Sequence, residues 1–219
     1  DGLRSTIGAA IQSASRVRDR FSIDGWMALN DLAKTAQQMT KTATPGDDAA
    51  RAMGVLLRKI TGFSGLVHEN MYRSVGWRFL SMGRSLERAL ATASALARFA
   101  DASASDGALD LAVEVGDSSM THRSRYAVAT TRNTVIDLLA LDAQNPRAIL
   151  YHLAELREHA AELSKAVGRE KMSDLLVAVM TVHGELAALA PDAVDSTALD
   201  RIADEIGRLS DVLTSEYLT

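Results

Sequence analysis

The segment GWRFLSMGRSLERALATA, residues 76–93, decides how this chain is interpreted. It contains no proline, and its apolar residues recur every three or four positions, which predicts an amphipathic helix. Successive helical residues are separated by about 100°, so Glu87 is expected at the edge of the apolar stripe. A carboxylate there is costly unless it is paired, and its nearest partners are Arg84, one turn earlier, or an arginine of another helix. The segment therefore predicts a half-buried Glu–Arg centre.

Arginines gather in this helix and just before it. The planar guanidinium group suits bidentate recognition of carboxylate or phosphate, which makes the cluster a candidate anion site. The candidate ligand-binding residues are Arg73, Trp77, Arg84, Glu87 and Arg88. In this interpretation the arginines contact the anion, Glu87 orients the guanidinium groups or binds an amine, and Trp77 forms a wall. Interhelical salt bridges would leave the same pattern, so a purely structural role stays open.

The remainder of the chain also favours helix. Of its 219 residues, 47% are hydrophobic and only three are proline, and no stretch shows the alternating pattern of a strand. We expect an all-α fold, an antiparallel helical bundle of long helices, because short linkers bring consecutive helices side by side. The chain is interpreted as a single domain spanning residues 1–219, with a subdivision near 101–107 as the alternative. The expected helices cover residues 3–21, 22–40, 44–71, 72–99, 108–115, 120–141, 145–163, 170–189 and 196–218.

Composition narrows the classes of function. Lys and Arg number 24 and Asp and Glu 28, so the net charge of −4 gives no basic excess for nucleic acid. The chain has no cysteine, which excludes disulfides, thiol nucleophiles and thiolate metal sites. No apolar run approaches the ~18 residues of a membrane span, so we expect no membrane partner and a cytoplasmic location. The motifs predict no catalytic residue, no metal site and no cofactor.

One predicted helix carries His152, Glu155, His159 and Glu162 on a single stripe. Di-iron bundles place a His three residues after a Glu on each of two helices. Here the His precedes the Glu, and no second element of this kind occurs in the chain. The stripe is therefore interpreted as a solvated, charged helix face.

Three segments carry a resemblance to a known family. They are SASRVRDRFSIDGWMALN (residues 13–30), GWRFLSMGRSLERA (residues 76–89) and LLALDAQNPRAILYHLAELREH (residues 138–159). In this order they resemble the alpha-E family, a bacterial all-helical family named for a conserved Glu-Arg motif. The family's motif positions fall on Trp26, Leu29, Asn30, Trp77, Gly83, Arg84, Glu87, Arg88, Asn145, Pro146 and Arg147.

The resemblance implies a functional context. Alpha-E proteins are associated with, and sometimes fused to, circularly permuted ATP-grasp proteins, in systems that also contain transglutaminase-like peptidases. The implied partners are an ATP-grasp protein, fused or separate, and a transglutaminase-like peptidase. Full-length members carry an earlier copy of the motif that this chain lacks, so we expect the N-terminal part of the family domain to be missing.

Three functions follow as alternatives. The first is a non-catalytic accessory domain, a scaffold for an ATP-grasp-type peptide or amide ligase that binds a peptide or carboxylate at the Glu-Arg centre. The second is an enzyme of peptide or amide metabolism with Glu87 as general base. The third is a structural bundle that serves homo-oligomerisation. A pocket open to water near Glu87 supports the first two, and a dry packed seam supports the third.

Overall fold

Helices and their connections make up the described part of the chain. The computed structural model describes residues 2–166, 168 and 171–218, and no strand occurs among them, so the all-α prediction is confirmed. Of the helices in these residues, none is both long enough and apolar enough to cross a membrane. The chain divides into two compact units, Asp1–Trp77 and Arg78–Thr219. Residues 101–107 lie inside the second unit, and the assignment of one functional domain to the whole chain stays a prediction.

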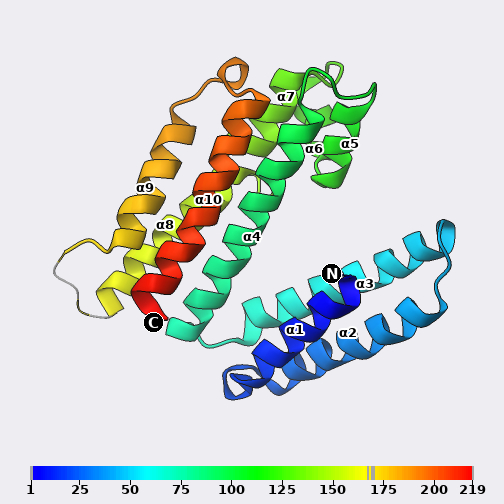
Figure 1. The fold of residues 1–219 in the computed structure, drawn as a ribbon, viewed down its shortest axis with the longest axis vertical. Helices are drawn as coiled ribbons and strands as arrows, with labels where there is room; N and C mark the ends of the chain where they lie inside the picture. Colours follow the sequence, from blue (N-terminus) through cyan, green and yellow to red (C-terminus); the bar gives the residue numbers. More distant parts are fainter. Residues whose placement is uncertain (1, 167, 169–170, 219) are drawn as a thin grey trace. The chain divides into compact units, whose positions relative to one another are not determined.

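The N-terminal unit contains three helices. They are α1 (Leu3–Ser15), α2 (Ile23–Thr42) and α3 (Asp47–Asn70), with a 3-10 turn at Arg18–Arg20 between the first two (Figure 1). The linker between α2 and α3 is short, which makes these two helices antiparallel neighbours. The three helices share a core that consists of Ile7, Ala14, Leu29, Leu32, Ala36 and Leu56.

The helix boundaries of this unit follow from local backbone chemistry. Ser22 caps α2, because its Oγ accepts a hydrogen bond from the Gly25 backbone N–H at 3.0 Å. The expected helix over 3–21 is wrong beyond Ser15, since Val17 leaves the helical conformation. α3 begins three residues later than expected, after Gly46, whose φ of 98° is a conformation that glycine adopts readily.

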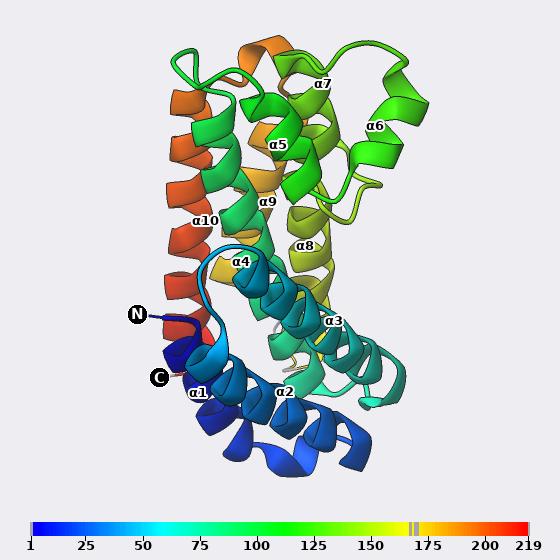
Figure 2. The same ribbon diagram turned by 90° about the vertical axis from the view of Figure 1, so that its right-hand side faces the viewer.

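The C-terminal unit is built around four long helices. These are α4 (Val75–Phe99, which starts at the end of the N-terminal unit), α8 (Ile149–Ala166), α9 (Asp174–Ala187) and α10 (Ser196–Tyr217). Figures 1 and 2 show them running alongside one another, while α5 (Ala108–Val115), α6 (Ser119–Tyr126) and α7 (Arg132–Ile136) gather at one end. A 3-10 turn at Pro191–Ala193 joins α9 to α10. The core includes Met82, Leu96, Ile136, Leu153, Leu163, Val179 and Leu199.

The segment between α5 and α8 departs most from the prediction. The expected helix over 120–141 is interrupted after α6, where Ala127 adopts a φ of 49°. Thr131 and Thr134 then form a capping box, so α7 starts as a new helix instead of continuing the old one. α7 widens into a π-helical turn over Asp137–Leu141, a feature frequent at functional sites.

Gly116, between α5 and α6, provides a test of this packing. A Cβ at this position would lie 2.7 Å from Leu139 Cδ2 and 3.1 Å from the Ala112 carbonyl oxygen. Leu139 is buried and would have to shift, and the Ala112 carbonyl oxygen belongs to the backbone, so Gly116→Ala is expected to lower the free energy of unfolding by about 1–3 kcal/mol. Urea denaturation followed by circular dichroism measures the change. The matched control is Gly184→Ala within α9, where no atom lies within 4 Å of the new Cβ and stability should rise by about 0.5–1 kcal/mol.

Candidate anion-binding site

The Glu-Arg segment lies in α4, but its carboxylate is not where the periodicity places it. Glu87 is exposed, Arg84 is exposed and Arg88 is half-buried. The buried face of α4 is centred on Met82, Leu86, Ala89 and Ala93, which turns Glu87 toward solvent. The expected half-burial of Glu87 is therefore wrong. Within the described ranges, no ion pair involves Arg84, Glu87 or Arg88.

Arg73 and Trp77 form a separate arrangement in the N-terminal unit. The Arg73 guanidinium donates hydrogen bonds to the backbone carbonyl oxygens of Met71 and His68 at the end of α3. It also lies over the Trp77 ring, with its Cζ 4.3 Å from the ring centroid, in a cation–π contact. Arg73 thus satisfies carbonyl groups that a helix end leaves without intrahelical partners.

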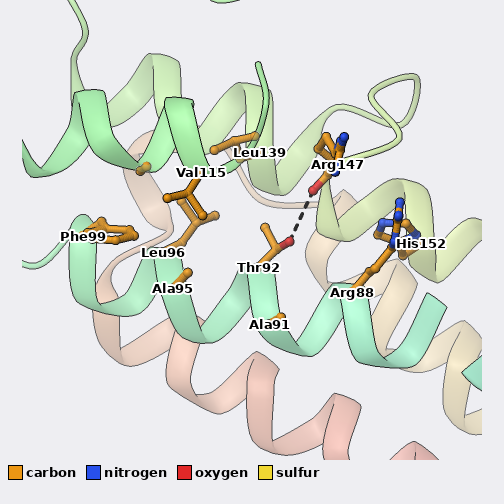
Figure 3. A pocket seen from close by; sticks show the side chains of 12 residues that line it. Arg88, Ala91, Thr92, Ala95, Leu96, Phe99, Val115, Leu139, Arg147 and His152 are labelled. Atoms are coloured by element: carbon orange, nitrogen blue, oxygen red, sulfur yellow. Dashed lines mark hydrogen bonds between the residues drawn. The ribbon is translucent and has the colours of Figure 1, made fainter. Parts of the chain in front are cut away.

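A pocket in the C-terminal unit contains the remaining arginines. Its volume is about 180 Å³, and it lies between α4, the α5–α6 junction, the π-helical turn and the start of α8 (Figure 3). The polar residues at the pocket are Arg88, Thr92, Arg147 and His152, and in Figure 3 the side chains of Arg88 and His152 lie next to each other. The apolar lining comes from Ala91, Ala95, Leu96, Phe99, Ala112, Val115, Gly116 and Leu139.

Asn145 positions Arg147 at this pocket. The Asn145 side chain is 9% exposed, and its Nδ2 donates to the Leu138 carbonyl oxygen at 2.8 Å and to Ser118 Oγ at 3.3 Å. Its Oδ1 accepts from the Arg147 backbone N–H at 3.1 Å. The expected helix start at 145 is wrong, because α8 begins at Ile149 and Asn145 instead anchors the preceding turn.

Two further contacts hold Arg147 in place. Thr92 Oγ1 on α4 donates a hydrogen bond to the Arg147 carbonyl oxygen at 3.3 Å, drawn as the dashed line in Figure 3. Arg147 Nη2 lies 2.6 Å from Asp117 Oδ2, an ion pair on the outer side of the turn. The Arg147 backbone is therefore fixed to α4 through Thr92 and to the π-helical turn through Asn145. This fixes the point from which the guanidinium group extends.

The charges at this end of the pocket are predominantly positive. Burial lowers the pKa of Arg88, and the positive charges of Arg84 and Arg147 lower it further. The Arg88 guanidinium group is therefore close enough to those of Arg84 and Arg147 to be repelled by each, and of the possible ion pairs of these three arginines with described carboxylates only Arg147–Asp117 forms. An anion at this position would relieve the repulsion and gain charge-assisted hydrogen bonds.

His152 is the buried polar group at the same place. It is 5% exposed, and its Nδ1 has no hydrogen-bond partner of good geometry among the residues that the structure describes. Burial, followed by the charges of Arg88 and Arg84, lowers the pKa of His152 to about 4, while the backbone of Pro146 acts in the opposite direction. The imidazole is therefore neutral at pH 7. It offers one N–H donor or one acceptor nitrogen to a ligand.

The prediction of a solvated stripe on α8 is wrong for both of its histidines. His152 and His159 are buried, whereas Glu155 and Glu162 are half-buried. α8 buries an apolar face that includes Leu153 and Leu156, and the two histidines extend that face. Helical periodicity alone does not show which margin of an apolar face is covered, because the neighbouring elements determine it.

Nearly the whole chain matches one family of helical domains. The family model described as a predicted alpha-helical domain with a conserved ER motif matches residues 1–218. The chain belongs to this family, Alpha-E, as the resemblance of its motifs predicts. Glu87-Arg88 is the Glu-Arg dipeptide in the sequence, and its arginine lines the pocket.

The curated relatives are themselves uncharacterized. Proteins of Mycobacterium tuberculosis and Mycobacterium bovis are each 26% identical to this chain over 238 residues. The match covers 99% of this chain and 26% of each relative, so the chain spans about a quarter of their length. No solved structure matches the chain.

Of the sequence-predicted candidates, the pocket contains Arg88 in its lining and has the charge of Arg84 nearby. Glu87 is not among the lining residues, and Arg73 and Trp77 belong to the other unit. Sequence reasoning did not assign Arg147, His152 or Thr92 to a site. The sequence signal near Arg147 is the Asn-Pro-Arg segment. Proline is common in the first turn of a helix, so this segment predicts a helix start, whereas the structure forms a turn there.

The low pKa of His152 predicts a pH dependence of stability. Between pH 6.5 and about 4 the unfolded chain binds a proton at this residue and the folded chain does not, so the free energy of unfolding falls as the pH falls. The contribution of this residue over that range is on the order of 2–3 kcal/mol. Urea denaturation at pH 7 and pH 4 should show a smaller loss for His152→Gln than for the wild type. His68→Gln, at an exposed histidine, is the control and should lose as much as the wild type.

Proposed function

We propose that this chain is a non-catalytic accessory domain that binds a carboxylate at an arginine centre and works with an ATP-grasp-type peptide or amide ligase. The observation that supports it is the convergence of Arg88, Arg147 and buried His152 at one end of a pocket. The charges of Arg84 and Arg147 act unfavourably on Arg88, so a group of opposite charge is favoured beside it. A carboxylate meets this requirement, because it is anionic and accepts several hydrogen bonds from guanidinium groups.

The lining residues support binding rather than catalysis. They include no Ser, Lys, Tyr or acidic residue among the described positions, and the hydroxyl of Thr92 already donates to the Arg147 carbonyl oxygen. His152, with a pKa of about 4, is a weak base at neutral pH. The alternative with Glu87 as general base loses its premise, since Glu87 is exposed and lies outside the lining. Homo-oligomerisation stays a prediction.

The partnership with an ATP-grasp protein rests on the family and on chain length. Alpha-E proteins are associated with such ligases, which activate a carboxylate with ATP before an amide forms. The mycobacterial relatives are about four times as long as the aligned segment, which leaves room for a fused catalytic domain. In this proposal the domain holds the carboxylate substrate or product near the ligase in the cytoplasm, and a transglutaminase-like peptidase acts in the same system.

Acetate is the simplest probe of the anion site. The pKa of His152 should rise when acetate binds, because the bound carboxylate offsets the charges of Arg88 and Arg84. The measurement is an NMR titration of the His152 Cε1–H resonance with increasing acetate at constant ionic strength. Arg88→Ala/Arg147→Ala should weaken acetate binding by about 100-fold or more, since two charge-assisted hydrogen bonds are lost and each contributes about 1.5–3 kcal/mol. Arg98→Ala, at an exposed arginine of the same helix outside this pocket, is the matched control.

The two halves of the proposal have separate tests. Acetate that perturbs the wild type and the double variant equally, with circular dichroism unchanged, contradicts the arginine centre. For the partnership, the immobilised chain is expected to capture a purified circularly permuted ATP-grasp protein from the same organism. Capture that fails with the wild-type chain, at concentrations where both proteins are folded, contradicts the partnership and leaves the anion site standing.

A further inference from the structure

The pocket extends well beyond the arginine centre. Arg88, Thr92, Ala95 and Phe99 line it from successive turns of α4, so it follows one face of that helix for about 16 Å at 1.5 Å per residue. Polar side chains occur at the Arg88 end, and Figure 3 shows Phe99 at the opposite end of this stretch of α4. The site therefore has a polar end and an apolar end.

Small residues create the space at the apolar end. Ala91 and Ala95 of α4 line the pocket where longer side chains would fill it. The opposite wall is closely packed, because Gly116 approaches Leu139 so tightly that even a Cβ would be 2.7 Å from Leu139 Cδ2. This wall has little freedom to move outward when a larger ligand enters.

The volume limits the size of the group that enters. At about 180 Å³ the pocket is smaller than the roughly 300–1,000 Å³ of sites for drug-sized ligands. A nucleotide is too large for this space, and inorganic phosphate would leave the apolar lining in contact with water. A carboxylate with a few carbon atoms attached matches the polar end, the apolar lining and the volume together.

We propose that the pocket binds an aliphatic carboxylate, with the carboxylate at Arg88 and Arg147 and a compact hydrocarbon group between Ala95 and Leu139. This inference rests on the anion site proposed above and adds the chemical class of its ligand. A free short-chain acid and the C-terminal residue of a peptide with an aliphatic side chain share this chemistry. His152 lines the same end of the pocket beside Arg88, so its resonance reports binding there.

A series of acids of increasing length tests the apolar end. Acetate, propionate, butyrate and 4-methylpentanoate are titrated into the chain, with the His152 resonance as the readout. Each methylene group that is buried should tighten binding about fourfold. Ala95→Met places a larger side chain in the apolar end, so it should abolish the gain in affinity with chain length. Ala187→Met, at an exposed residue that ends α9, is the control and should retain the gain.

Peptide ligands separate the two sources of the carboxylate. N-acetyl-alanyl-leucine is compared with its C-terminal amide and with 4-methylpentanoate. Binding of the peptide acid at least as tightly as the free acid, with no binding of the amide, supports a peptide end as the ligand. Binding of the free acid alone supports a short-chain acid. Both results support an aliphatic carboxylate site.

Other results overturn the inference in distinguishable ways. Equal affinity for acetate and 4-methylpentanoate, or a gain with length that Ala95→Met leaves intact, refutes the apolar end but leaves the anion site. Tighter binding of inorganic phosphate than of any acid refutes the carboxylate class. If no anion perturbs His152 in a folded chain, both this inference and the anion-binding part of the proposed function are wrong.

Discussion

The site in the C-terminal unit depends on the hydrogen bonds of one buried side-chain amide, that of Asn145. The π-helical turn over Asp137–Leu141 interrupts the regular helical hydrogen-bond pattern, and Asn145 donates to the carbonyl oxygen of Leu138 within that turn. The same side chain holds the Arg147 backbone and contacts Ser118 before α6. One buried amide thus joins three segments, and its own polar atoms are satisfied by doing so.

Electrostatics give this region a different character from the rest of the unit. Two arginines elsewhere in this unit are neutralised locally, because Arg125 pairs with Asp137 and Asp142 and Arg201 pairs with Glu185 and Glu205. At the pocket the positive charges of Arg84 and Arg88 approach that of Arg147 without comparable compensation from described carboxylates. Like charges held together lower stability, and this cost is the physical basis for proposing an anion site here.

The family's Glu-Arg motif gains a physical interpretation from this geometry. Adjacent helical residues point about 100° apart, so the two members of the pair need not face the same environment. Arg88 points to the pocket, and Glu87 is exposed. The arginine of the motif is thus part of the pocket inside the domain. The carboxylate is available at the surface of α4, where a partner protein could contact it.

Several features of this protein were determined by its sequence alone. Apolar periodicity predicted an all-α fold, because a helix of 3.6 residues per turn aligns apolar residues whatever surrounds them. The start of α2 close to the expected residue 22 also depends on local chemistry, because the hydrogen bond from Gly25 to Ser22 spans only three residues. The motifs sufficed to place the chain in its family.

Only the tertiary structure decided where the site lies. Thr92 and Arg147 are 55 residues apart, and Asn145 bonds to Ser118 across 27 residues, so no local pattern predicts either contact. Burial of His152 depends on the elements packed against α8, and the exposure of Glu87 depends on which face of α4 they cover. Helical periodicity locates the centre of an apolar stripe only to within about one residue, which is about 100° around the helix. A carboxylate at the edge of the stripe can be buried or exposed within that uncertainty.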